Sequence, residues 1–577
     1  MVRGDDRSLE ALRLSERRDR SLRPARDPSA AISSRPPHLS IHSSPVLSSI
    51  AVMLAFTASR AQDAPLPEMP LTVPEASEWS RTSTHAEVLA FLEELRELPS
   101  AERLVVETVG GTQEKRELVL VTAKLPRDPE SPPPLRIFVN ANIHAGEVEG
   151  KEAVQMLLRE IASGEHEALL RGADLMFLPV YNADGNDRID KKNRTSQNGP
   201  DGGVGERANA QGLDLNRDFV KAESPECRTL LRLFRMHDPH LFMDLHTTNG
   251  SHHGYQLTYS PSLSTNIDAE LDAFARGTLL PEVRAAVLKE HGYRTFDYGN
   301  FSRGEQRRWS TYDHRPRFGT NYYGLRNRLS VLSEAYSYAD YETRVRATRA
   351  FVLEVITTAV KHADRIRAVC DAADARVLEG ADIQHGFDSE LVEGSQAEVL
   401  VGSVETVELP DDLGRRSVAL PEFTSETMLV QDAFHSKQQI ALPWAWAIPA
   451  PSYVELDLLL AHGVHIRRLR TSAMVAAYEF APEKIHKGSR LFQGHHEVTL
   501  RGEWRATERE LPTGTLIVSA RQSLGRVAAQ LLEAQSEDSL STWNMFESRT
   551  RAGEDPTYPV LRLSTPHELD TEPVGQR

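Results

Sequence analysis

The chain is poor in cysteine, in basic charge and in long apolar runs. Only two of its 577 residues are cysteines, Cys227 and Cys370, so no disulfide framework is implied. Two solitary buried thiols are expected, and a single bridge between them is the alternative. The net charge is −16, and no basic face is visible in the sequence, which argues against a nucleic-acid partner. With 40% hydrophobic and 26% charged residues, the composition is that of a globular protein with room for two or three domains.

One apolar run lies near the N-terminus. Residues 45–58 are uncharged, and Ser59-Arg60-Ala61 follows with small residues at positions −3 and −1 of a cut after Ala61. Such a run is short for a membrane span and typical of a secretory signal, although a buried helix is an alternative. We therefore expect a targeting segment with a disordered extension at 1–61 and a linker at 62–83. The protein would be secreted or periplasmic, with no stable membrane span after signal removal.

Between residues 84 and 370, strand-like apolar runs alternate with segments of helical periodicity. A capping box begins at Thr84, and apolar residues follow it at helical intervals. Strands are predicted at 104–109, 117–123, 135–143, 174–181, 240–245 and 329–332, and helices at 150–162, 225–236, 266–291 and 341–368. This alternation predicts an α/β domain with a mixed, largely parallel central sheet and helices on both faces.

From about residue 371 the pattern changes to short apolar runs separated by turn residues. Strands are expected at 398–407, 454–460, 497–500 and 515–518, and one helix at 523–533. Residues 371–577 are therefore predicted to form a smaller, β-rich accessory domain that packs on the first.

Two predicted strands end in residues that can bind a metal. His144 and Glu147 follow the strand 135–143, and His246 follows the strand 240–245. In open α/β sheets, sites form at the carboxyl ends of the strands, so both can present ligands to one point. A catalytic zinc takes three protein ligands and keeps a fourth position for water. Each histidine alone fits a structural role, but the two strand ends together favour a shared metal.

Two further segments carry polar groups suited to catalysis. In Asp214-Leu215-Asn216-Arg217, the guanidinium and the amide suit a substrate carboxylate or an oxyanion, and an ion pair of Arg217 with Asp218 is the alternative. Glu334 ends an apolar strand, where a carboxylate is costly without a partner or a task. It can take a proton from zinc-bound water and pass it to a leaving amine, or it is an ordinary carboxylate at the rim.

The order His-x-x-Glu, Asn-Arg, His and strand-borne Glu resembles the zinc carboxypeptidase family over roughly residues 84–365. The resemblance implies that His144, Glu147 and His246 hold one Zn²⁺ per chain. It also implies that Asp214 orients the first ligand histidine, as the outer partner of a metal-bound imidazole does.

The same resemblance implies roles in binding and catalysis. Asn216 and Arg217 match the pair that grips the terminal carboxylate of the substrate, and Glu334 matches the general base. Residues 182–185 look like the Asn-Pro-Asp-Gly turn of the family, with Ala183 in place of proline.

Two elements of the family pattern have more than one candidate. For the arginine that polarises the scissile carbonyl, Arg194 is preferred to Lys191, because a planar fork suits an oxyanion better. For the mobile tyrosine, Tyr312 has the expected spacing before the base, and Tyr322 and Tyr323 compete. The sequence does not decide between basic and apolar substrates.

Together these residues predict a zinc metallopeptidase that removes C-terminal residues from peptide or protein substrates. A zinc-dependent deacylase or amidase of N-acyl amino acids or cell-wall peptides is the alternative among enzymes, since it shares the same pairs of residues. A non-catalytic peptide-binding protein is the alternative of another class, and the presence of the ligands and the base argues against it. The oligomeric state stays open.

Overall fold

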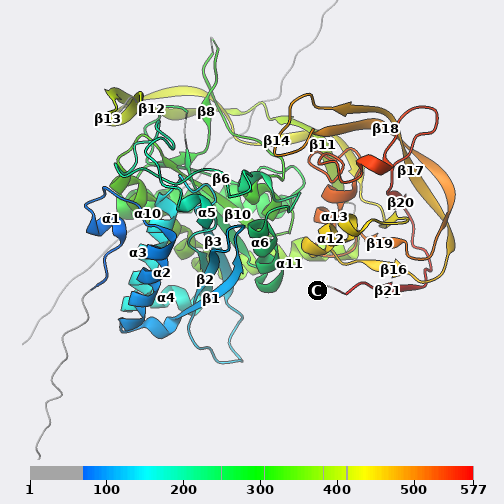
Figure 1. Cartoon of the computed structure of the whole chain (residues 1–577), viewed down its shortest axis with the longest axis horizontal. Helices are drawn as coiled ribbons and strands as arrows, with labels where there is room; N and C mark the ends of the chain where they lie inside the picture. The colour runs from blue at the N-terminus through cyan, green and yellow to red at the C-terminus, as the bar shows by residue number, and fades with distance from the viewer. Residues whose placement is uncertain (1–68, 249, 305, 381–382, 411–412, 576–577) are drawn as a thin grey trace, which may run out of the picture. The chain divides into compact units, whose positions relative to one another are not determined.

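The computed structural model describes residues 69–575 except 249, 305, 381–382 and 411–412 (Figure 1). The predicted targeting segment and the start of the linker lie outside these residues. Within the described part, no helix has the length and apolar character needed to cross a membrane. Both cysteines are free and buried, as expected from their isolation.

A mixed sheet of eight strands organises the first part of the chain, in the order β1-β2-β4-β3-β5-β10-β6-β7. Strands β4, β3, β5 and β10 are parallel neighbours, and β6 is parallel to β7. The pairs β1-β2, β2-β4 and β10-β6 are antiparallel. The predicted mixed α/β sheet is confirmed, and β2 has the predicted bounds. The strands are β1 (Leu104–Gly111), β2 (Glu117–Ala123), β3 (Leu135–Ala141), β4 (Ala173–Leu178), β5 (Leu241–Thr248), β6 (Leu257–Pro261), β7 (Thr295–Asp297) and β10 (Leu329–Tyr336).

Side chains alternate between the two faces of this sheet. On one face, Val121, Val139 and Met243 share a core with several helices. The predicted helix at 341–368 is two helices, because the chain leaves helical geometry at His362. The helices of this core include α2 (His85–Glu94), α3 (Glu149–Ser163), α4 (Glu167–Gly172), α7 (Ala269–Phe274), α8 (Leu280–His291), α10 (Tyr341–Lys361) and α11 (Ala363–Glu379).

The second face packs on α6 (Pro225–His237) and on the C-terminal region. Phe138 and Phe242 belong to one core with Trp446 and Trp543, so a single apolar core crosses the predicted domain boundary. Helix α11 also runs through residue 371. The boundary near residue 371 stays a prediction.

The C-terminal region is rich in strands, as predicted. Two long strands, β12 (Ser395–Glu408) and β13 (Arg415–Gln431), extend a sheet with the short β8 (Asn300–Phe301) and β9 (Arg308–Ser310). A two-stranded sheet joins β11 (Gln384–Leu391) and β14 (Phe434–Ala441), and a seven-stranded sheet has the order β18-β17-β20-β15-β19-β16-β21. The last comprises β15 (Ala445–Ile448), β16 (Arg467–Leu469), β17 (Ala473–Lys487), β18 (Val498–Leu511), β19 (Leu516–Ser519), β20 (Leu561–Leu563) and β21 (Thr571–Pro573), with α13 (Gly525–Leu532) nearby in sequence.

One prediction for this region is wrong. The apolar run at 454–460 is a helix, α12 (Tyr453–Ala461), and it contacts α6 (Figure 1). Ser452 and Glu455 form a capping box. The backbone N–H of Ser452 donates to the Glu455 carboxylate at 2.9 Å, and the backbone N–H of Glu455 donates to the Ser452 hydroxyl at 3.2 Å. Residues 454–458 alternate between apolar and acidic side chains, a period typical of a strand, and the capping box was the better signal.

Candidate metal centre and cavity

The sheet brings His144, Glu147 and His246 together. Strands β3 and β5 are parallel neighbours, so the turn after β3 that holds His144 and Glu147 lies beside His246 at the end of β5. Helix α3 starts directly after this turn and approaches β5 closely. A Cβ on Gly150 would lie 2.7 Å from the Cβ of Leu245, so this approach requires glycine.

Three ligand atoms converge at this point. The Nδ1 atoms of His144 and His246 each lie 3.0 Å from a carboxylate oxygen of Glu147, and 3.2 Å from each other. All three side chains are buried. A tetrahedral Zn²⁺ with bonds of about 2.0–2.1 Å holds its ligand atoms roughly 3.3 Å apart, so these separations fit the ion.

Each histidine also has a carboxylate at its outer nitrogen. His144 Nε2 lies 2.9 Å from Asp214 Oδ1, and His246 Nε2 lies 3.0 Å from Asp244 Oδ2. With the proton on each Nε2, both Nδ1 lone pairs face Glu147 and each other, an arrangement that is repulsive unless a cation lies between them. The donor set therefore fits a divalent metal. Asp244 is missing from the sequence prediction, although its place two residues before His246 sets both on one face of β5.

The carboxylates at the centre differ in how readily they hold a proton. Burial would raise the pKa of Glu147, but His144 and Arg194 outweigh it and hold that pKa well below its usual range. Glu334 lies opposite His246 in the register of β10 and β5, where burial raises its pKa to about 8. Glu147 is thus ionised, and Glu334 is able to exchange a proton near neutral pH.

A cavity of about 230 Å³, here called the central cavity, opens in front of the three ligands and is lined by Asn216, Arg217 and Glu334. The Arg217 guanidinium stacks 4.0 Å from the ring centre of Phe318, and no carboxylate of the described residues lies within salt-bridge distance of it. Asp218 pairs instead with Lys221 at 2.7 Å, so the alternative ion pair of Arg217 is not formed. Its Nη1 donates to the Asn216 carbonyl at 2.6 Å, and the guanidinium charge is left for a ligand.

Of the three candidate tyrosines, Tyr312 alone lines the central cavity. Its hydroxyl lies 3.1 Å from Thr320 Oγ1. Tyr322 and Tyr323, on α9 (Gly319–Gly324), are buried elsewhere and bond to His462 and to a backbone carbonyl. Tyr298, which sequence reasoning missed, packs edge-on against Tyr312 in the same wall.

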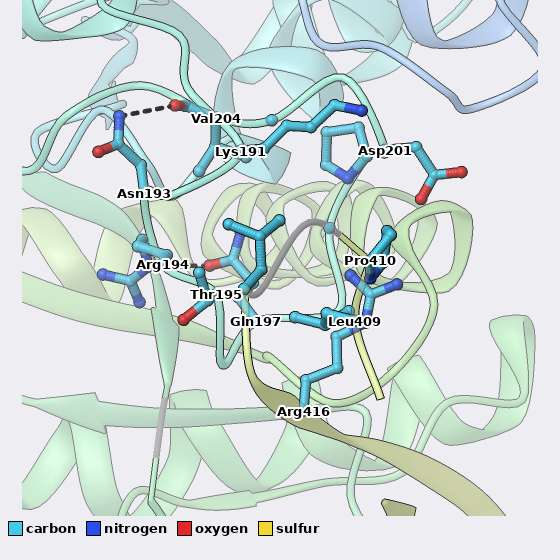
Figure 2. Close-up of a pocket in the computed structure, with 14 residues that line it drawn as sticks. Lys191, Asn193, Arg194, Thr195, Gln197, Asp201, Val204, Leu409, Pro410 and Arg416 are labelled. Carbon is cyan, nitrogen blue, oxygen red and sulfur yellow. Dashed lines mark hydrogen bonds between the residues drawn. The ribbon is translucent and has the colours of Figure 1, made fainter. Parts of the chain in front are cut away.

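Two arginines donate to the same oxygen of Glu147, Arg194 at 2.9 Å and Arg207 at 3.4 Å. Arg194 donates to Glu147 at 2.9 Å and lines, with Lys191, a separate pocket of about 300 Å³ (Figure 2). Arg207 lines the central cavity, where its side chain is 41% exposed and holds Asp214 Oδ2 through two hydrogen bonds of 3.0 and 2.9 Å. Sequence reasoning missed Arg207 because no local pattern marks it within its loop.

Residues 88–323 match the family model described as zinc carboxypeptidase, so this segment is similar to the domain of that family. The match covers less than half of the chain, includes the three ligands and ends before Glu334. No curated protein matches the chain.

Several solved structures resemble the chain. A metallo-carboxypeptidase from Burkholderia cenocepacia has 17% identity and a TM-score of 0.37, over 49% of this chain and 70% of that one. One from Pseudomonas aeruginosa has 20% identity and a TM-score of 0.37, over 50% and 70%. Bovine thrombin-activatable fibrinolysis inhibitor has 14% identity and a TM-score of 0.37, over 50% and 99%. Likenesses at this level carry no argument about activity.

Proposed function

We propose that the chain is a zinc carboxypeptidase that hydrolyses the last peptide bond of a peptide substrate. The observation that carries this proposal is the presence in one cavity of three converging metal ligands, an available guanidinium and a glutamate with a raised pKa. Zn²⁺ held by His144, Glu147 and His246 would polarise the scissile carbonyl and acidify water.

The protein's own groups would bind and orient the substrate. Arg217 and Asn216 receive the terminal carboxylate, because a guanidinium fork binds both carboxylate oxygens at once. Asn216 is held in place for this task, since its Oδ1 accepts a 2.8 Å hydrogen bond from Gly319 N. The half-exposed Arg207 would stabilise the oxygen on which negative charge develops, whereas Arg194, at 2.9 Å from Glu147 against 3.4 Å for Arg207, would mainly neutralise that carboxylate.

Proton transfer falls to Glu334. In its ionised form it accepts a proton from the attacking water, and it then delivers that proton to the amine that leaves. Tyr312 in the cavity wall is placed to contact the bound substrate.

The cavity also bears on the choice of substrate. Besides Glu147 and Glu334, its acidic lining residue is Asp313, and Arg315 binds both oxygens of that carboxylate. No free carboxylate of the described lining therefore awaits a basic side chain, and we expect neutral C-terminal residues to be preferred.

The test is incubation of the purified chain with a peptide library read by mass spectrometry. We expect ladders that lose one C-terminal residue, abolished by a chelator and restored by Zn²⁺. Peptides amidated at the C-terminus should resist, because Arg217 then has no carboxylate to bind. Internal cuts, or hydrolysis that survives chelation, would contradict the proposal. Faster cleavage of N-acyl amino acids than of peptides would favour the deacylase alternative.

A further inference from the structure

The C-terminal region reaches the loop that carries Asp214. Between β17 and β18 the chain reverses at Gln493 and Gly494, where Phe492 and His495 exchange backbone hydrogen bonds of 2.8 and 3.0 Å. Gln493 is left-handed, with φ of 49°, at the tip of this turn. From there its Oε1 accepts a 2.8 Å hydrogen bond from the backbone N–H of Asp214.

A second contact fixes the loop that carries Phe318. The preceding residue, Arg317, is 3% exposed, and Asp538 accepts hydrogen bonds of 2.7 to 3.0 Å from its backbone N–H and guanidinium. Glu497 accepts a further hydrogen bond of 2.5 Å, and the ring of Trp543 lies 4.8 Å from the guanidinium carbon. A buried cation is thus satisfied by carboxylates of the C-terminal region.

Each of these two contacts holds a residue that itself contacts a group of the proposed mechanism. The Asp214 carboxylate holds His144 Nε2, and the Phe318 ring stacks on Arg217. Two parts of the site, the metal side and the carboxylate side, are therefore held from outside the segment that matches the peptidase family.

We propose that the C-terminal region positions groups of the active site, and that Gln493 and Asp538 are its positioning residues. Gln493 fixes the backbone of Asp214 and so keeps its carboxylate on the first ligand histidine. Asp538 anchors Arg317 and so keeps Phe318 beneath the guanidinium that binds substrate. The inference rests on the proposed carboxypeptidase function. It separates into two effects, one on zinc affinity and one on substrate binding.

The Gln493 effect is tested by two replacements of similar length in the full chain. Gln493→Met removes the acceptor, and Gln493→Glu keeps one. Because one neutral hydrogen bond is lost, we expect Met to weaken zinc binding about fivefold and Glu to restore it to within about twofold. Zinc affinity is measured by competition with a chromogenic chelator. Leu491→Ala, at a 59% exposed position in the same turn, is the control and should change nothing. Wild-type zinc affinity in the Met variant would overturn this half of the proposal.

The Asp538 effect is tested by Asp538→Asn, which keeps the shape and removes the charge. We expect KM for a peptide with a free carboxylate to rise about tenfold, with kcat and zinc affinity within about twofold, since misplacement of a binding group costs this much or more. Asp268→Asn is the control, because Asp268 is also buried and paired with arginine, at 2.6 Å from Arg376, but lies away from the cavity.

An equal rise in KM in both variants, or none in Asp538→Asn, would overturn this half of the proposal. If Asp538→Asn does not fold, Glu497→Gln tests the same anchor at its more exposed partner, with a smaller rise in KM expected. If the wild-type chain cleaves no peptide, the proposed function is wrong. The zinc affinities of the Gln493 variants would still decide whether Gln493 positions Asp214 at the metal site.

Discussion

Replacement of Asp214 by asparagine probes the arrangement around the metal most directly. Each oxygen of this carboxylate accepts two hydrogen bonds. Oδ1 accepts from His144 Nε2 at 2.9 Å and from Asn216 N at 3.0 Å, and Oδ2 accepts from Arg207 Nε and Nη2 at 3.0 and 2.9 Å. An asparagine has only one oxygen, so in either orientation its NH₂ group faces two donors.

Both orientations harm the site. If the NH₂ group faces His144, the imidazole must accept at Nε2, and its proton moves to Nδ1, the atom that would bind the metal. If it faces Arg207, two charge-assisted hydrogen bonds are lost, each worth about 1.5–3 kcal/mol. Loss of an outer partner of a metal-bound histidine weakens metal binding by about 10–100-fold. This corresponds to about 1.4–2.7 kcal/mol in binding free energy.

The assay is zinc affinity by chelator competition, together with kcat/KM at saturating zinc. Asp268→Asn serves again as the control, because it removes a buried charge that pairs with Arg376 and Arg526 and should lower the melting temperature without changing zinc affinity. Zinc affinity of Asp214→Asn within threefold of wild type would refute the reasoning, because the orientation of His144 would then not depend on this carboxylate.

Four further predictions concern the cavity. Glu334→Gln should lower kcat by about 10²–10⁴-fold without changing zinc affinity, since a general base contributes that much to the rate. The residual kcat/KM of this variant should no longer fall as pH decreases through the pKa of the base. In the chelated chain, burial raises the pKa of Glu334 from 4.5 to about 8, so the folded state holds this proton more tightly than the unfolded state. The wild type should therefore lose stability relative to Glu334→Gln as pH rises from about 4.5 to about 8. A difference in melting temperature between the two proteins that stays constant over this pH range would contradict this. Arg207→Lys should lower kcat more than Arg194→Lys does, because Arg207 lines the cavity, and the opposite order in steady-state kinetics would return the carbonyl-polarising role to Arg194. Arg217→Lys should raise KM about tenfold with little change in kcat, because the planar fork is lost, and an unchanged KM would place the carboxylate elsewhere.

Much of the sheet was predictable because its signals are local. The apolar run of β2 ends where turn residues begin, and its observed bounds, Glu117–Ala123, are those predicted. His144 and His246 were found together because parallel strands place their carboxyl ends at one edge, and β3 and β5 are neighbours. Their roles as ligands stay a prediction.

The remaining features depend on contacts between distant parts of the chain. Arg207 lies in a loop whose path is set by long-range hydrogen bonds, such as that from Glu206 N to Gly185 O, so no periodicity marks it. Gln493 and Asp538 are separated from the residues they hold by more than two hundred positions, and nothing in their own neighbourhoods indicates a partner. The helix at Tyr453–Ala461 differs from these, because its capping box was readable but the alternation of apolar and acidic residues at 454–458 resembled a strand.

The core that joins the second face of the central sheet to the C-terminal region also constrains the order of events during synthesis. Phe138 and Phe242 leave the ribosome long before Trp446 and Trp543, which belong to the same core. Domains that fold as units from the N-terminus do not wait for later residues, but here α6 covers only part of this face, and its core is completed when the C-terminal region has been made. A nascent chain of this protein therefore exposes the unfinished part of that core until translation is nearly complete, and a chaperone that binds apolar surfaces would meet it in that interval.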